Sequence, residues 1–198
     1  MSEKFPAMLA RMNYIDRWGL MRNSRPESLS EHSLFTAYVA HYLSVLAVRR
    51  FGADVDPMRV ACAAMYHDAS EILTGDMPTP VKYGSDALRD EYKRVEAAAE
   101  RRLLGLLPED LRDDYIPFLS GEGLSERERR IVKAADKISA LVKCREEMSA
   151  GGREFSSAME STIKSLRIDP LPETELFLSQ CLPAFNLTLD ELLAEEEQ

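Results

Sequence analysis

This sequence contains no long apolar segment and no excess of positive charge. No window of roughly 18 uncharged residues could form a membrane helix, and charges interrupt the apolar positions near the N-terminus, where a secretory signal needs an unbroken apolar stretch. The 34 acidic residues outnumber the 25 basic ones, and a net charge of -9 argues against a broad surface for a nucleic acid polymer. We therefore expect a cytoplasmic protein that binds neither membranes nor nucleic acid polymers. A local cluster of cations could still bind a small anionic substrate.

Cysteine is scarce as well. The three cysteines, Cys62, Cys144 and Cys181, are far apart and lie in apolar helical patterns, which favours buried structural thiols over a disulfide framework or a zinc knuckle. Alternating β-branched runs, internal repeats and linkers rich in Pro, Gly and Ser are missing too. We predict a single all-α domain that spans residues 1–198.

Most of the chain carries apolar residues at the three- and four-residue spacing of amphipathic helices. Ser30 is the expected N-cap of the second helix, and Ser125 with Glu128 forms a capping box at the start of a long one. Two prolines in the segment MPTPVK predict an extended loop. The predicted helices cover residues 3–16, 31–50, from Asp56-Pro57 towards Gly75, 86–107, a shorter helix from Pro108, a long helix from Ser125 to near Gly151-Gly152, and two later stretches.

Only three histidines are present, and two of them stand out by their positions. His67 and Asp68 are adjacent, so on a helix their side chains lie about 100° apart and both can reach one point. Asp136 lies within the apolar segment IVKAADKISALV, where a carboxylate needs a partner, and His32 offers a second imidazole from a third helix. Two nitrogens and two oxygens suit a divalent ion such as Mn, Fe, Co, Ni or Zn. A lone His-Asp doublet, by contrast, is often only a hydrogen-bonded pair.

We therefore predict one metal ion held by His32, His67, Asp68 and Asp136. Four protein ligands leave open positions for water and a phosphate oxygen, as in metal-dependent hydrolases. Glu71 follows His67 by four residues and so lies on the same helix face. His41 follows His32 by nine residues and points to the opposite face, where we expect a structural or surface role.

The order H…HD…D resembles that of the HD-domain phosphohydrolases, and the surrounding segments resemble the bacterial YfbR-type 5'-deoxynucleotidases over most of the chain. The segments that carry this resemblance are RWGLMRN, SEHS, MYHDASEILTGDMPTPVK and KAADKISALVKC. The resemblance implies an HD-domain helical bundle that removes phosphate from deoxyribonucleoside 5'-monophosphates. It also implies one divalent metal, such as Co or Mn, and a homodimer.

The resemblance further implies roles for individual residues. These are catalysis for Glu71 and Arg17, and substrate binding for Arg17, Trp18, Asp76, Pro78 and Thr79. Arg17 would orient the phosphate through its planar fork of donors, and Glu71 would transfer a proton. Each residue also has a plainer interpretation: Arg17 could be a salt-bridged arginine, Trp18 a core residue, and Asp76 a turn residue after Gly75.

Two other functions stay open at this point. The first is another HD phosphohydrolase that acts on triphosphates, alarmones or cyclic nucleotides through the same ligands. The second is a non-catalytic nucleotide sensor that retains the metal for structure. Assays of the products released from a panel of nucleotides separate these alternatives.

Overall fold

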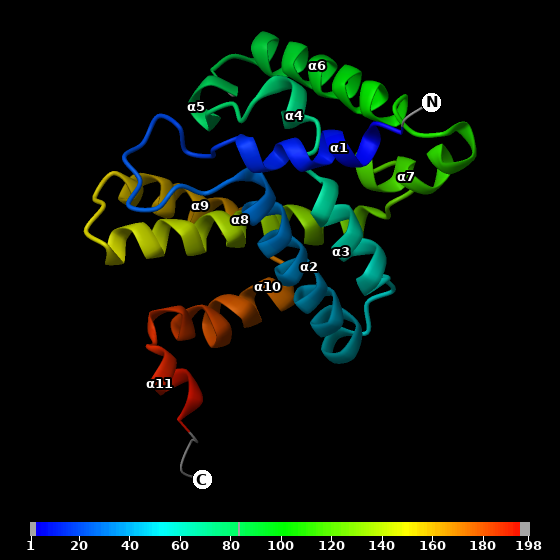
Figure 1. Ribbon diagram of the computed structural model, residues 1–198. Helices are drawn as coiled ribbons and strands as arrows, with labels where there is room; N and C mark the ends of the chain where they lie inside the picture. Colours follow the sequence, from blue (N-terminus) through cyan, green and yellow to red (C-terminus); the bar gives the residue numbers. More distant parts are fainter. Residues whose placement is uncertain (1–2, 83, 195–198) are drawn as a thin grey trace.

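The computed structural model describes residues 3–82 and 84–194, and its regular structure is helical (Figure 1). The helices are α1 (Phe5–Leu9), α2 (Leu29–Phe51), α3 (Pro57–Tyr66), α4 (Glu71–Thr74), α5 (Thr79–Lys82), α6 (Asp86–Leu104), α7 (Arg112–Leu119), α8 (Glu126–Ser149), α9 (Phe155–Ile168), α10 (Pro172–Leu176) and α11 (Leu189–Leu193). The β structure within the described ranges is one isolated antiparallel bridge between Asp16 and Ser28. The prediction of an all-α fold is confirmed.

Two long helices, α2 and α8, form the centre of the molecule. Helix α2 packs against α3 and α8, and α9 packs along α8 (Figure 1). Their shared core includes Leu43, Val60, Ile138 and Leu141, each with no exposed surface. Full burial of such a side chain stabilises the fold by roughly 1.5–3 kcal/mol. Polar side chains placed where α2, α3 and α8 meet are therefore held by rigid elements.

A second, smaller core lies above the end of α3. It joins Phe5 of α1, Ala69, Leu103 near the end of α6, and Leu119 of α7. Helix α6 crosses the top of the molecule in Figure 1 and contacts α4 and α7. This second core holds the short turn and helix that follow α3.

The start of α2 differs from the prediction, because the N-cap is Ser28 and not Ser30. The Ser28 hydroxyl accepts a hydrogen bond from the Glu31 backbone N–H at 3.2 Å, and the Glu31 carboxylate accepts one from the Ser28 backbone N–H at 2.8 Å. This reciprocal capping box satisfies two unpaired helix donors, which Ser30 could not do without a carboxylate three residues later. His32 therefore lies one turn inside the helix.

The helix predicted from Asp56 towards Gly75 is interrupted. Helix α3 ends at Tyr66, residues 67–70 form a turn, and α4 begins at Glu71. Within the turn the backbone bonds tighten to a three-residue spacing, as from Ala69 N–H to the Tyr66 carbonyl at 2.9 Å. The spacing of apolar residues could not predict this break, because the residues on both sides of the turn have the pattern of a helix.

The segment MPTPVK is only partly the extended loop that its prolines predict. Residues 75–78 are extended or irregular, but Thr79–Lys82 form α5. Pro80 lies in the first turn of this helix, where its missing N–H costs nothing. The side chains of Thr79 and Pro80 lie outside the described part of the chain.

Other boundaries shift by a few residues. The predicted helix 3–16 is α1 followed by a 3-10 segment, Ala10–Tyr14, and the predicted helix 86–107 ends at Leu104. The shorter helix after Pro108 begins with a 3-10 turn, Glu109–Leu111, and continues as α7. The long helix that begins after Ser125 is confirmed as α8, with both capping-box hydrogen bonds present.

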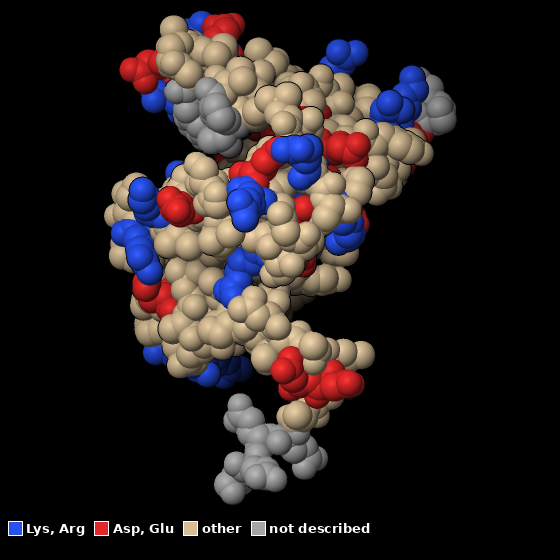
Figure 2. Space-filling view, turned by 90° about the vertical axis from the view of Figure 1, so that its left-hand side faces the viewer, with Lys and Arg blue, Asp and Glu red and all other residues tan. Residues whose placement is uncertain are grey.

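The exposure of the cysteines and of His41 agrees with the sequence prediction in most places. Cys144 is buried as predicted, whereas Cys62 and Cys181 are only partly buried, and all three are free thiols. His41 is exposed, as its helical position predicts. Acidic and basic side chains are interspersed over the face in Figure 2. Of the helices in residues 3–82 and 84–194, none is long and apolar enough to span a membrane.

Candidate metal centre

Three helices bring the four predicted ligands to one place. His32 lies in the second turn of α2, His67 and Asp68 lie in the turn directly after α3, and Asp136 lies midway along α8. The interruption of α3 lets both members of the doublet face the same point. One ligand atom from each of the four residues lies within 4.8 Å of the others.

The distances between these atoms are those of a cluster that shares one centre. His32 Nε2 lies 3.1 Å from Asp136 Oδ1 and 3.6 Å from Asp68 Oδ2. His67 Nε2 lies 3.1 Å from Asp68 Oδ2 and 3.8 Å from Asp136 Oδ1. Each imidazole therefore faces both carboxylates through its Nε2 atom.

The other ring nitrogen of each histidine is already engaged. His67 Nδ1 lies 2.7 Å from the Ala64 carbonyl oxygen, which accepts only, so Nδ1 carries a proton and Nε2 is the nitrogen that the neutral ring can offer to a metal ion. His32 Nδ1 lies 3.1 Å from the Ser139 hydroxyl. His67 Nε2 is buried and has no hydrogen-bond partner among the described atoms. An orphaned imidazole nitrogen that faces two carboxylates fits a divalent cation.

Burial and charge act against each other in this cluster. Burial lowers the pKa of His67, but Asp68 and Asp136 outweigh it and raise the pKa well above its usual value. Burial raises the pKa of Asp68, yet His67 brings it down to about 2. The pKa of Asp136 is also lowered, by His32 and His67 against the effect of burial. The carboxylates are thus ionised, as metal ligands must be.

Arg17 and Glu71 flank the cluster. Arg17 Nη1 donates to Asp68 Oδ2 at 3.2 Å, which places the guanidinium beside the ligand set. Glu71 is 6% exposed, and its Oε2 has no hydrogen-bond partner in the described part of the chain. Burial, followed by the charges of Asp68 and Asp76, raises the pKa of Glu71 to about 9, against the opposing effects of Arg17 and Lys82. In the metal-free protein this carboxyl group is therefore protonated at neutral pH.

Trp18 and Asp76 meet although 58 residues separate them. The Trp18 backbone N–H donates to Asp76 Oδ2 at 3.3 Å. Trp18 has a φ of 60°, a left-handed conformation that side chains rarely adopt, and Gly75 before Asp76 has a φ of 74°. Pro78 follows in the irregular segment before α5 and is partly buried, and the backbone of Thr79 begins α5.

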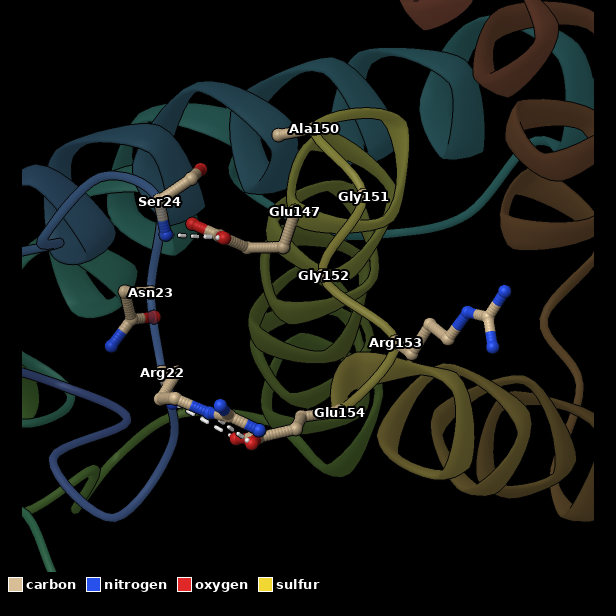
Figure 3. A pocket seen from close by; sticks show the side chains of 9 residues that line it. All are labelled: Arg22, Asn23, Ser24, Glu147, Ala150, Gly151, Gly152, Arg153 and Glu154. Atoms are coloured by element: carbon tan, nitrogen blue, oxygen red, sulfur yellow. Dashed lines mark hydrogen bonds and ion pairs between the residues drawn. The ribbon is translucent and has the colours of Figure 1, made fainter.

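Two cavities lie near these elements. One of about 280 Å³ borders the cluster at His67 and Asp136 and has Phe118 and Lys133 in its wall. The other, of about 420 Å³, lies between residues 22–24 and the turn after α8, and no predicted ligand lines it (Figure 3). In that view the side chains of Glu147 in α8 and Glu154 after α8 point toward residues 22–24. This second cavity therefore lies between two packed segments of the chain.

Comparisons with known proteins identify the relatives of this chain. A model of the 5'-deoxynucleotidase YfbR-like family matches residues 4–185. The chain belongs to this family. It is 50% identical over 188 residues to a 5'-deoxynucleotidase from Vibrio parahaemolyticus, covering 95% of this chain and 97% of that protein. It is 46% identical to the 5'-deoxynucleotidase YfbR of Salmonella paratyphi B, covering 95% and 94% of the two chains.

Solved structures show the same fold. An HD-domain phosphohydrolase from Listeria innocua superposes with a TM-score of 0.76 at 24% identity, over 92% of this chain and 88% of that one. The cyanophage S-2L HD phosphohydrolase DatZ, bound to dA and one catalytic Zn²⁺, superposes with a TM-score of 0.65 at 17% identity, over 95% and 99%. The expected HD-domain helical bundle is confirmed.

Sequence reasoning did not single out two polar residues that contact this site. Ser139 bonds to His32 from one turn after Asp136 on α8, and Glu27 lies between Arg17 and Trp18. Ser139 carries a weak signal, since it follows Asp136 by three residues and shares its helix face. Glu27 carries no such sequence signal, because its contacts depend on how the segment before α2 folds back onto residues 15–17.

Proposed function

We propose that this chain is a metal-dependent 5'-deoxynucleotidase, which hydrolyses deoxyribonucleoside 5'-monophosphates to deoxynucleosides and phosphate. The observation that carries the proposal is the convergence of four ligand atoms within 4.8 Å of one another. The Arg17 guanidinium, 3.2 Å from Asp68, adds the cation that a phosphate needs at this acidic site. Relatives of 50% identity that are 5'-deoxynucleotidases support the substrate class.

In this proposal His32, His67, Asp68 and Asp136 hold one divalent ion, with Co, Mn or a similar metal as the native ion. The zinc in the cyanophage relative supports a divalent ion in this fold. When bound, the ion supplies Lewis-acid chemistry, which lowers the pKa of water and neutralises charge that develops on the phosphate. The donor set of two imidazole nitrogens and two carboxylate oxygens suits such borderline ions.

The remaining roles belong to the chain itself. Arg17 orients the phosphate through charge-assisted hydrogen bonds, because its guanidinium already lies beside the ligand cluster. Glu71 is protonated in the metal-free protein and can donate a proton to the leaving sugar oxygen. Once ionised, the same group can accept a proton from water, so both directions of transfer are open to it.

Sugar selectivity is proposed to come from Trp18 and Asp76. Asp76 Oδ2 already accepts from the Trp18 backbone, which leaves Oδ1 for a sugar hydroxyl. The indole of Trp18 forms a flat wall, and we assign substrate contacts also to Pro78, in the irregular segment before α5, and to Thr79, the first residue of α5. A 2'-hydroxyl crowded against this wall costs on the order of 1–3 kcal/mol, or roughly tenfold to a hundredfold in selectivity.

We extend the proposal to the whole chain. Residues 1–198 form one HD-type domain, and the protein is a cytoplasmic homodimer that binds no nucleic acid polymer. The dimer is supported by large apolar side chains that stay exposed along α2, of which Tyr38 at 63% is the most exposed. The net charge of -9 supports the absence of a polymer partner.

Phosphate release from dAMP and AMP in parallel tests the proposal. The protein is stripped with EDTA and restored separately with Co, Mn, Mg or Zn. Metal-dependent release that favours dAMP is expected. Equal release from both nucleotides would keep the hydrolase and remove the proposed role of Trp18 and Asp76. Pyrophosphate or triphosphate release from other nucleotides, or tight binding without turnover, would favour the other phosphohydrolases or the sensor.

A further inference from the structure

The carboxylate of Glu27 lies between the two side chains that the proposed function assigns to phosphate and sugar. Glu27 Oε2 accepts a hydrogen bond from Trp18 Nε1 at 3.1 Å. The same oxygen lies 3.4 Å from Arg17 Nε, and the Glu27 and Arg17 side chains are only 14% and 12% exposed. A largely buried carboxylate that faces a cation and an indole N–H is well matched to both.

The backbone holds Glu27 in this place. The Arg17 N–H donates to the Glu27 carbonyl at 2.9 Å, and the Leu29 N–H donates to the Ile15 carbonyl at 2.8 Å. Together with the bridge between Asp16 and Ser28, these bonds pair residues 15–17 with residues 27–29 in antiparallel fashion. The capping box at Ser28 then fixes this short ladder to the start of α2.

Each partner of Glu27 is held at a second point. Arg17 also donates from Nη1 to Asp68 Oδ2 at 3.2 Å, so the guanidinium lies between two carboxylates, hydrogen-bonded to Asp68 and ion-paired with Glu27. The Trp18 ring also packs against Phe155 of α9, with ring centroids 5.3 Å apart. Without Glu27, the guanidinium keeps only its Asp68 contact and the indole loses its polar anchor.

We propose that Glu27 is a positioning residue that fixes the Arg17 guanidinium and the Trp18 indole, and thereby sets both phosphate binding and the preference for deoxyribose. The inference rests on the proposed function for its catalytic consequences. The contacts themselves are independent of that function, so they can be tested without turnover.

The kinetic test compares Glu27→Ala with Glu27→Gln. Glu27→Ala removes both contacts, so KM for dAMP rises and the dAMP/AMP ratio of kcat/KM falls about tenfold. Glu27→Gln keeps a side-chain carbonyl that accepts from Trp18 Nε1 but loses the charge beside Arg17. We therefore expect it to raise KM while it keeps the dAMP/AMP ratio within about twofold of the wild type.

Glu154→Gln is the matched control. Glu154 accepts from the backbone N–H and the Nε of Arg22, at 3.0 and 2.6 Å, and so holds the same 16–28 segment through Arg22 and not through Arg17 or Trp18 (Figure 3). It should leave KM and the dAMP/AMP ratio at wild-type values. Equal effects from Glu154→Gln and Glu27→Ala would overturn the proposal, because general loosening of the segment would then explain both.

Fluorescence supplies a readout that needs no activity, since Trp18 is the only tryptophan. Glu27→Ala should shift the emission to the red and increase acrylamide quenching, whereas Glu27→Gln and Glu154→Gln should not.

The outcomes separate this inference from the proposed function. If the wild type releases no phosphate, the proposed function fails, but the emission of Trp18 still reports its contact with Glu27. Wild-type KM and dAMP/AMP ratio in Glu27→Ala would overturn the positioning role. If Glu27→Ala does not fold, Glu27→Asp replaces it as the test variant, because its shorter side chain moves the carboxylate away from Arg17 and Trp18. Glu27→Asp should then lower the dAMP/AMP ratio of kcat/KM. An unchanged ratio would overturn the positioning role of Glu27.

Discussion

In the proposed function the buried carboxyl group of Glu71 transfers a proton and does not hold the metal. It lies outside the set of four converging ligand atoms, and its Oε2 has no partner among the described residues. We expect Glu71→Ala and Glu71→Gln to retain metal while kcat falls by about a hundredfold or more. Metal content by elemental analysis and phosphate release from dAMP check this. Unchanged turnover in either variant would exclude the role in proton transfer.

Ser139 orients His32, one of the four proposed metal ligands. Its hydroxyl lies 3.1 Å from His32 Nδ1 and fixes the ring with Nε2 towards the carboxylates. Ser139→Ala should weaken metal affinity about tenfold to a hundredfold, because partners of this kind orient metal-bound imidazoles. Titration of stripped protein with Mn or Co measures the change. Ser44→Ala is the control, since Ser44 is also buried on the α2 side of the core but bonds only to the Ala40 carbonyl.

At the residue scale, the sequence pointed to the four side chains that converge in the structure, but not to the residues that contact and orient them. His32, His67, Asp68 and Asp136 follow a recognisable order, and charge in an apolar helix demands a partner. The bond from Ser139 to His32 spans 107 residues of sequence, and the spacing of Ser139 to Asp136 indicates only a shared helix face, not this partner. Contacts of this kind depend on how α2 and α8 pack, which only the structure supplies.

At the element scale, α8 anchors the loop that carries Arg17 and Trp18. Glu147 accepts from the Ser24 backbone N–H at 2.7 Å and from Lys143 at 2.5 Å, and its side chain is 1% exposed. Burial raises the pKa of Glu147, but Lys143 and the Ser24 backbone outweigh it and lower the pKa to about 2. The loop is therefore held to the long helix by a buried ionised group.

This arrangement predicts a pH dependence of stability. Because the pKa of Glu147 is lower in the folded state than its ordinary value of 4.5, its contribution is complete above about pH 4.5 and is lost as pH falls towards 2. Glu147→Gln should lower the free energy of unfolding at pH 7 by on the order of 2–3 kcal/mol, and the difference should shrink as the pH falls from about 4.5 towards 2. Urea denaturation at several pH values measures it. Glu146→Gln, at an exposed neighbouring position, should show no such pattern.

Element boundaries were predictable where a cap motif is complete. Ser125 and Glu128 predicted the start of α8 correctly. The prediction of Ser30 as the N-cap of α2 was wrong, because only Ser28 has a carboxylate, Glu31, three residues later. The break after Tyr66 could not be read from apolar spacing, although it is what turns His67 and Asp68 towards one centre. The turn that orients His67 and Asp68 is therefore a part of the candidate site that local sequence patterns do not predict.

At the scale of the whole molecule, the exposed apolar side of α2 predicts self-association. Leu34, Tyr38 and Tyr42 are 45%, 63% and 45% exposed and follow at four-residue intervals, so they form one stripe. Tyr38→Glu should reduce the mass measured by light scattering from that of a dimer to that of a monomer. Ile168→Glu, at an 82% exposed position on α9, should leave the mass unchanged. A wild-type monomer would remove the proposed homodimer.

The four proposed metal ligands come from α2, α8 and the turn after α3, so an ion bound there would connect distant parts of the chain across the core. A ligand that binds only the folded state at a hundred times its Kd adds about 2.7 kcal/mol, which for a chain of this length raises Tm by roughly 5–10 °C. We expect Mn or Co to raise the Tm of EDTA-stripped protein by this amount. Asp136→Asn should abolish the increase, because it removes the charged oxygen nearest to His32 Nε2. A full increase in Asp136→Asn would mean that the stabilising ion binds elsewhere, and the cluster of four would then lose its assignment as the metal site.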